Sequence, residues 1–162
     1  MRIHEWASSE AACRYQAWGP NEPTDTRRFV ADALTAWAQD SQARRVWVAE
    51  VAELGVIGLG ELKVRSVRHL QAEIAYAVHV GFWGRGFGAA IATALMDVAF
   101  AEGMHRVFAT CDPRNTASSR VLQKVGMRYE GTLRHTLSLR DGWRDSDMYA
   151  LIAGDAQSAL QP

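Results

Sequence analysis

The chain has 162 residues, a length that suits one domain built around one hydrophobic core. Its 18 Lys and Arg residues equal its 18 Asp and Glu residues, so the formal net charge is zero. A protein dedicated to nucleic acid, which needs an excess of basic residues, is therefore not expected. Without a run of about 18 apolar residues or the apolar core of a signal peptide, the sequence predicts a cytoplasmic protein with no membrane partner. Cys13 and Cys111 are isolated thiols, whose spacing predicts neither a disulfide framework nor a metal site.

Two helices are expected before the first strand. Residues 5–15 are weakly helical, and two prolines and a glycine within residues 18–23 then forbid a continuous helix. Thr24 or Asp25 can cap the next helix, whose apolar side chains recur at helical spacing as far as Trp37.

Three strands and a long helix follow. Residues 46–51 and 55–64 predict two strands joined by a tight turn, and residues 74–80 predict a third. After a glycine-rich loop, apolar residues on one helical face predict a helix that ends near Gly103.

A strand and a shorter helix come next. Residues 106–111 predict the strand, and Asp112 to Asn115 form a turn into a helix that ends at Gly126.

The chain is expected to close with a hairpin. Strands near residues 128–139 and 146–152 flank the turn at residues 140–142, because Asp-Gly is a strong hairpin signal. Residues 1–152 are thus predicted to form a single α/β domain, a mixed sheet with helices on its faces. The tail over residues 153–162 is expected to fray.

The most informative stretch is the glycine loop Gly84-Arg85-Gly86-Phe87-Gly88-Ala89, which lies between a strand and a long helix. Glycines let the backbone approach a phosphate without Cβ clashes, and the free N–H groups of the following helix bind the anion. A turn that only packs the helix on the sheet is the alternative. A dinucleotide-binding loop fits less well, because three strands precede it and the next strand ends in Thr110-Cys111 rather than in an acidic residue.

Two separated motifs give the chain a resemblance to a known family. The loop, with its preceding strand and following helix, resembles the coenzyme A signature of the GNAT superfamily of N-acetyltransferases. The series from Asn115 to Arg134, closed by Asp145 and Tyr149, is similar to the RimJ/RimL-type branch. The resemblance implies a GNAT fold, with a mixed, mostly antiparallel sheet of about six to seven strands and about four helices. It also implies an enzyme that moves an acetyl group from acetyl-coenzyme A to a primary amine without a metal.

The same resemblance implies roles for individual residues. Backbone groups of Tyr76, Ala77 and Val78 would pair with the pantetheine arm as an added strand. Asn115 would bond the pantetheine amide and Ser118 would protonate the departing thiolate, although both residue types also cap helices. The pyrophosphate would be held by the amides of Gly84, Arg85, Gly86, Phe87, Gly88 and Ala89.

The base that must deprotonate the amine is less evident. Glu73, at the start of the third strand, is the preferred candidate, with a solvated strand-end charge as the alternative interpretation. His79 and His135 are further candidates. Leu122 stands where many relatives carry a tyrosine acid, and Trp83 stands where Gln or Arg is usual. The usual first strand of the family is largely missing from the N-terminus.

Several acceptors are consistent with the sequence. A protein N-terminal amine is the first expectation, while a polyamine- or aminoglycoside-type acceptor and a non-catalytic acyl-CoA sensor are the alternatives. Trp18 and Trp143 are candidates for the mouth of the acceptor site, and the chain is expected to act alone or as a homodimer. The acids that could build a cleft for a polycation are Glu22, Asp25, Glu50, Glu53 and Glu61.

Overall fold

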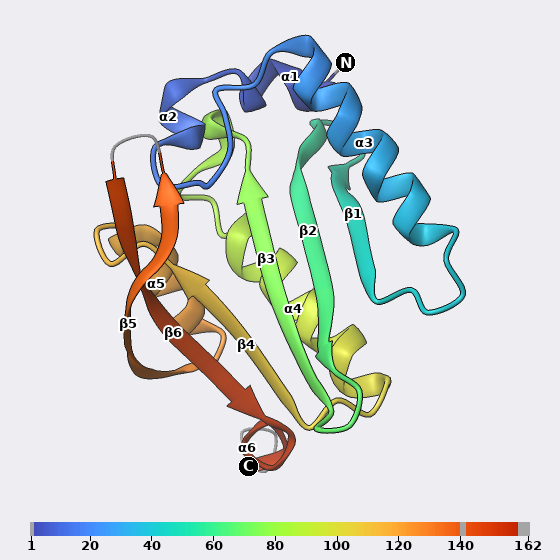
Figure 1. Ribbon diagram of the computed structural model, residues 1–162, viewed down its shortest axis with the longest axis vertical. Helices are drawn as coiled ribbons and strands as arrows, with labels where there is room; N and C mark the ends of the chain where they lie inside the picture. Colours follow the sequence, from blue (N-terminus) through green and yellow to red (C-terminus); the bar gives the residue numbers. More distant parts are fainter. Residues whose placement is uncertain (1, 140–141, 159–162) are drawn as a thin grey trace.

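The computed structural model describes residues 2–139 and 142–158, with side chains as far as Asp155. Its helices are α1 (Arg2–Ala7), α2 (Glu10–Cys13), α3 (Pro23–Trp37), the 3₁₀ turn η1 (Val80–Phe82), α4 (Phe87–Ala101), α5 (Thr116–Lys124) and α6 (Ala153–Ser158). Its strands are β1 (Arg44–Val51), β2 (Gly55–Ser66), β3 (Gln71–Val78), β4 (Arg106–Cys111), β5 (Arg128–Leu139) and β6 (Gly142–Ile152). They form one six-stranded sheet in the order β1-β2-β3-β4-β6-β5 (Figure 1). Only the β3–β4 pair is parallel, so the predicted mixed, mostly antiparallel sheet is confirmed.

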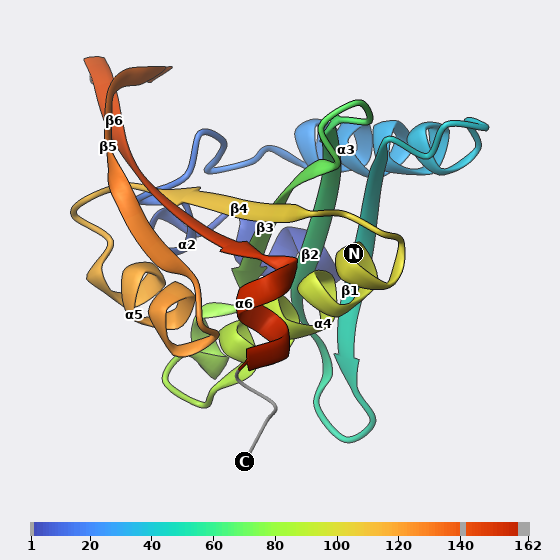
Figure 2. The ribbon, with the colours of Figure 1, turned by 90° about the horizontal axis from the view of Figure 1, so that it is seen from below.

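Helices cover both faces of this sheet (Figure 2). The helices α4 and α5 lie on one face and α3 lies on the other. The main core packs α4 against the sheet and includes Leu62, Ile74, Leu95 and Val107, while a smaller cluster centres on Trp6. Because β2 is covered on both sides, its residues do not alternate between buried and exposed: half of them are buried and one is exposed. Among the described residues, no helix is both long and apolar enough to cross a bilayer.

The N-terminal helices differ in detail from the predicted ones. The weakly helical segment is divided into α1 and α2, and α3 begins at Pro23, ahead of the expected caps at Thr24 or Asp25. Glu22 is the N-cap, and its backbone N–H donates to the Asp25 carboxylate at 3.0 Å in a capping box. Proline is well placed at the first helical position because the N–H it lacks would have no partner there.

The first end of the chain lacks a strand before its helices, as expected, while the second differs from the prediction. The helix α1 occupies the N-terminus, and β1 therefore forms one edge of the sheet. The tail that was expected to fray from Ala153 begins instead with α6, and Arg128 forms an ion pair of 3.2 Å with Asp155 in that helix. The predicted hairpin turn spans residues 140–142, of which 140 and 141 lie outside the described residues and Gly142 begins β6.

The strands β3 and β4 are paired at one end and separate toward the other (Figure 1). On the opposite side of β3, the His79 N–H donates to the Ile57 carbonyl at 2.8 Å. Since backbone groups alternate in direction along a strand, those of Tyr76 and Val78 face the gap toward β4. Within the described residues, the three β3–β4 pairs are Gln71↔Arg106, Ala72↔Val107 and Glu73↔Phe108.

Candidate active site

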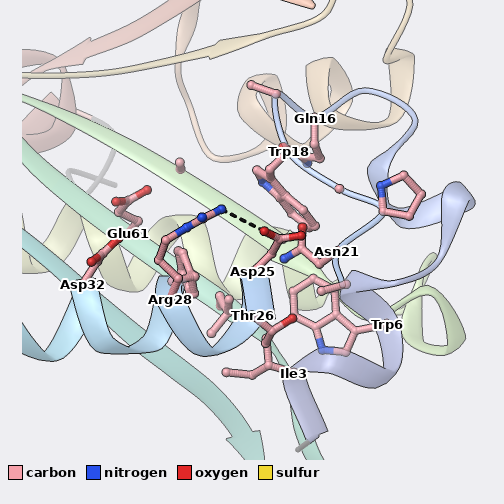
Figure 3. Close-up of a pocket in the computed structure, with 18 of the residues that line it drawn as sticks. Ile3, Trp6, Gln16, Trp18, Asn21, Asp25, Thr26, Arg28, Asp32 and Glu61 are labelled. Atoms are coloured by element: carbon pink, nitrogen blue, oxygen red, sulfur yellow. Dashed lines mark hydrogen bonds and ion pairs between the residues drawn. The ribbon is translucent and has the colours of Figure 1, made fainter. Parts of the chain in front are cut away.

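Two cavities meet where β3 leaves β4. The first, of about 450 Å³, lies between the glycine loop, β3 and α5, and we call it the loop cavity. The second, of about 500 Å³, lies between α1, α3, β2 and β3, and we call it the α3 cavity (Figure 3). The residues that line both cavities are Trp6, Gln16, Tyr76 and Ala77.

The loop cavity gathers most of the predicted site residues. Residues from β3, from the glycine loop and from the start of α5 converge on it although they are far apart in the sequence. Arg85 is not among the described residues that line it, because its guanidinium lies over the rings of Phe82 and Phe87, 5.5 and 5.3 Å from their centroids. The predicted residues that do line it are Tyr76, Ala77, Val78, Gly84, Gly86, Phe87, Gly88, Ala89, Asn115 and Ser118.

The glycine loop exposes its backbone to this cavity. Gly84 and Gly86 have φ values of +74° and +85°, in the left-handed region that favours glycine, and a Cβ at either position would meet nothing within 4 Å. Gly86 is the N-cap of α4, so the first N–H groups of that helix lie beside it without partners inside the helix. The loop is therefore shaped to bring amide donors close to an anion.

The charges around the loop cavity have one sign. Arg120 and Lys124, both from α5, line it, and no carboxylate is found among the described residues of its wall. These cations and the positive end of the α4 dipole favour a polyanionic ligand such as a nucleotide phosphate.

Trp83 gives one edge of the loop cavity an unexpected hydrogen bond. The indole Nε1–H of this half-exposed residue donates to the carbonyl of Val78 at 2.8 Å. That carbonyl faces the gap between β3 and β4, where no strand supplies a donor. Trp83 thus gives the Val78 carbonyl the hydrogen-bond donor that a neighbouring strand would otherwise supply.

The start of α5 brings two further predicted residues into the cavity wall. The Asn115 Oδ1 accepts a hydrogen bond of 3.1 Å from the Ser118 backbone N–H, so Asn115 caps the helix. The Ser118 hydroxyl lies 3.0 Å from the Tyr76 hydroxyl. Burial raises the pKa of Tyr76 to about 12, and that of Cys111, whose thiol also bonds to Ser118, to about 11. Leu122 points into the core and is only 1% exposed.

The predicted bases are not brought to either cavity. The Glu73 carboxylate accepts a hydrogen bond of 2.7 Å from Arg65 Nε, and this described residue is absent from both walls. Glu73 lies at the end of β3 that is still paired with β4, away from the gap. His79 is engaged by the Gly81 N–H, and the ring of His135 stacks on Trp143. Glu73 therefore lies apart from both cavities, and its assignment as the base stays a prediction.

The α3 cavity has the opposite charge. Asp25, Asp32 and Glu61 line it together with one cation, Arg28, whose guanidinium is bonded to Asp25 at 2.8 Å (Figure 3). Sequence reasoning missed Asp32, although its spacing of seven residues from Asp25 places both on one face of α3.

Carboxylates outnumber cations among the residues that line the α3 cavity. Glu61 is also ion-paired with Arg44 and Lys63, at 2.5 and 3.1 Å, so Asp32 is the acid of this wall for which the described residues show no ion pair. Asp32 therefore carries most of the attraction for a positively charged ligand.

Other acceptor-side expectations are only partly met. Trp18 lines the α3 cavity, where it lies edge-on to Trp6 at 6.2 Å between ring centroids. Trp143 is 64% exposed and is absent from the described wall. The acids Glu22, Glu50 and Glu53 are also absent from that described wall. Among the described residues, no three His, Cys, Asp or Glu side chains gather as metal ligands.

The sequence is similar to those of bacterial N-acetyltransferases. The uncharacterized N-acetyltransferase YoaA of Bacillus subtilis is 30% identical over 150 residues, which cover 90% of this chain and 82% of YoaA. The uncharacterized N-acetyltransferase YnaD of the same organism is 33% identical over 81 residues, which cover 49% of this chain and 48% of YnaD.

Solved structures share the fold. A GNAT-family acetyltransferase from Bacillus anthracis matches with a TM-score of 0.76 and 27% identity, over 92% of this chain and 86% of that one. The spermidine N-acetyltransferase from Vibrio cholerae, in complex with CoA and spermine, matches with a TM-score of 0.80 and 19% identity. The match covers 96% of this chain and 90% of that one. The ribosomal L7/L12 alpha-N-protein acetyltransferase RimL, in complex with coenzyme A, matches with a TM-score of 0.81 and 20% identity. The match covers 93% of this chain and 86% of that one.

A family model matches most of the chain. The model described as acetyltransferase (GNAT) domain covers residues 1–128. These include α3 and α4, which lie on opposite faces of the sheet, and the whole glycine loop. The chain therefore belongs to the GNAT family of acetyltransferases.

Proposed function

We propose that the loop cavity binds acetyl-coenzyme A, that the α3 cavity binds a small cationic amine, and that the acetyl group is transferred where the two cavities meet. The observation that carries this assignment is the charge separation. A wall with Arg120 and Lys124 suits the phosphates of coenzyme A, while the wall with Asp25, Asp32 and Glu61 suits an ammonium group.

The residues of the loop cavity fit the co-substrate along its length. The open backbone at Gly84 and Gly86 accommodates a pyrophosphate on the amides that begin α4. The backbone groups of Tyr76 and the N–H of Val78, which face the gap beside β3, can pair with the amides of the pantetheine arm. The Val78 carbonyl already accepts the hydrogen bond from Trp83 Nε1–H. When bound, acetyl-coenzyme A supplies a thioester carbonyl, and the rest of the chemistry is positioning.

Transfer requires a neutral amine and a leaving thiolate. The amine nitrogen forms a bond to the acetyl carbon, the carbon–sulfur bond breaks with its electron pair on sulfur, and the amine proton passes to water. The carboxylates of the α3 cavity draw in the ammonium form and hold it at the junction, where it loses a first proton to water and becomes the neutral amine that attacks. Ser118 and Tyr76 are the two predicted residues with hydroxyl groups that line the loop cavity, and we assign to Ser118 the hydrogen bond donated to the sulfur. Glu73 is given no part, because Arg65 engages it outside both cavities.

The acceptor class rests on the α3 cavity and on the fold neighbours. The spermidine N-acetyltransferase shares the fold and acts on a polyamine, and the carboxylates of the α3 cavity favour that class. RimL acts on a protein N-terminus, and the series from Asn115 to Tyr149 that resembles its branch supports a peptide amine as the second candidate.

An acceptor panel tests this proposal. Consumption of acetyl-coenzyme A is measured with spermidine, an aminoglycoside and peptides with free N-termini. We expect turnover with small cationic amines, and Asp32→Asn should lower kcat/KM for them about tenfold while the affinity for coenzyme A stays the same. Asp97→Asn, which removes an exposed carboxylate from α4, is the matched control and should change neither quantity.

The other outcomes are equally informative. Turnover with peptides alone would replace the cationic amine by a protein N-terminus. Tight binding of acetyl-coenzyme A without turnover of any amine would identify a sensor rather than an enzyme, and the assignment of the α3 cavity would fall.

A further inference from the structure

Arg144 on β6 contacts a segment from the other end of the chain. Its Nη1 donates a hydrogen bond of 2.6 Å to the carbonyl of Tyr15, which lies 129 residues away in the sequence. The pairing of β6 with β4 begins at Asp147, and Arg144 lies three residues earlier in the strand, where it is paired with Leu137 of β5. The β5–β6 ribbon therefore extends past the end of β4 and brings Arg144 to this segment (Figure 2).

A buried carboxylate balances the charge of Arg144. The side chain of Arg144 is 10% exposed and that of Asp112 is 1% exposed, with 3.9 Å between Nε and Oδ2. Asp112 also fixes the turn from β4 into α5, because its carboxylate accepts from the Arg114 N–H and its carbonyl accepts from the Asn115 N–H, both at 2.8 Å. Arg144 is thus anchored to this turn while it holds the Tyr15 carbonyl.

The segment that Arg144 holds has little regular structure of its own. The helix α2 has four residues, which is too short to be stable alone, and residues 14–18 form turns and bends after it. Tyr15 and Gln16 line the loop cavity, and Gln16 also lines the α3 cavity. Arg144 and Asp112 are absent from both described walls. Any effect of Arg144 on the cavities is therefore exerted through this segment.

We propose that Arg144 is a positioning residue: it holds Gln16 at the junction of the two cavities, and so fixes the wall beside which the acetyl group passes to the amine. This inference rests on the proposed function, whose exchange of bonds it leaves unchanged. Both substrates have their charged anchors elsewhere, the donor at the glycine loop and α5 and the acceptor at α3. Loss of Arg144 should therefore misalign the reacting groups more than it weakens binding.

The test compares two equally buried arginines. Arg144→Met removes the hydrogen bond to Tyr15. Arg45→Met is the control, because the Arg45 side chain is also 10% exposed, is ion-paired with Glu102 and is absent from both described walls. Arg144→Lys, which keeps the charge and a donor, provides the same comparison where Arg144→Met does not fold.

Two measurements are made on each variant. The first needs no substrate and is the hydrogen–deuterium exchange of the amides of residues 14–18. The second is kcat and KM for acetyl-coenzyme A with the best amine of the acceptor panel. Each kcat is divided by the fraction of molecules that bind coenzyme A in calorimetry, so that a partly unfolded sample does not imitate a loss of catalysis.

We expect Arg144→Met to speed exchange over residues 14–18 about fivefold, through loss of one hydrogen bond. It should lower the normalised kcat about tenfold to a hundredfold, with little change in KM. Arg144→Lys should recover part of both losses. Gln16→Ala should also lower kcat, and adding Arg144→Met to it should cause little further loss, since one residue acts through the other. Arg45→Met should change neither quantity, even where it lowers the melting temperature.

Several results would overturn the inference while leaving the proposed function intact. Unchanged exchange over residues 14–18 in Arg144→Met would show that Arg144 does not hold the segment. Faster exchange with an unchanged kcat, or a rise in KM alone, would show that the position of the segment does not matter for transfer. Equal losses of kcat in Arg144→Met and Arg45→Met, or full additivity with Gln16→Ala, would remove the positioning role. Failure of the unaltered protein to bind coenzyme A would end the proposed function, and this inference with it.

Discussion

The side chain of Asn115 has two ends with separate tasks. Its Oδ1 is occupied by the Ser118 N–H, which leaves the amide NH₂ as a donor for a ligand carbonyl in the loop cavity. Asn115→Ala should lower the free energy of unfolding by about 1 kcal/mol through loss of the cap, whereas Asn115→Ser, which keeps a capping oxygen, should cost only a few tenths. Both variants should weaken coenzyme A binding about fivefold through loss of one hydrogen bond.

Thermal melting and calorimetric titration of the same samples separate the two tasks. Wild-type affinity in Asn115→Ser would show that Asn115 serves only as the helix cap.

At this scale, sequence reasoning succeeds where a residue's role is local. Asn115 and Ser118 sit three residues apart at a helix start, and that spacing alone indicates their relation. Glu73 illustrates the opposite case, because its neighbour Arg65 comes from another strand and its distance from the gap depends on the register of β3 on β4. The hydroxyl contact of Tyr76 with Ser118 spans 42 residues and is invisible in the sequence for the same reason.

Among the elements, the junction of the glycine loop with α4 offers the clearest test. A Cβ on Gly88 would lie 3.4 Å from Tyr76 Cε2 and 3.5 Å from Val121 Cγ2, which are ordinary contacts, and Gly88 is inside α4. Gly88→Ala should therefore keep or raise the melting temperature, because alanine favours the helix by about 0.5–1 kcal/mol. It should nevertheless weaken coenzyme A binding by adding a methyl group to the cavity wall.

The control for this prediction is Gly103→Ala at the far end of α4. Gly103 has a φ of +82°, so alanine there should destabilise the helix end without changing coenzyme A affinity. Unaltered binding by Gly88→Ala would show that the loop only packs the helix on the sheet.

Most elements could be predicted because each carries its own pattern. Glycines mark the ends of α4 and α5, and alternating or continuous apolar runs mark the strands. The start of α3 was placed too late because a glutamate is an uncommon N-cap, and Pro23 was counted as a helix breaker rather than as a first helical residue. The gap between β3 and β4 could not be predicted from either strand alone, since pairing is a property of two strands.

On the scale of the whole molecule, the charges are sorted between two cavities although the net charge is zero. Coenzyme A binding should weaken as salt rises, since screening reduces the attraction of its phosphates to Arg120 and Lys124. Replacing both cations by glutamine should lower the affinity about tenfold at low salt and flatten the salt dependence. Calorimetric titrations at low and high salt measure both effects.

Arg68→Gln provides the comparison, because it removes one exposed cation from the turn between β2 and β3 and is absent from the described cavity walls. If coenzyme A affinity fell equally with salt in the unaltered protein, the double variant and Arg68→Gln, the α5 cations would not contact the phosphates. Composition could not reveal this sorting, because equal totals of acids and bases are compatible with any arrangement in space.

The loop cavity runs from the start of α4, beside Gly86, to the Tyr76–Ala77 stretch of β3, where it meets the α3 cavity. The distance between these two elements therefore sets the length of the thiol-bearing arm that the cavity can hold. An acetyl group on a thiol too short to span this length would leave one end empty. We therefore expect a truncated acetyl donor to bind more weakly than acetyl-coenzyme A, although both carry the same acetyl group.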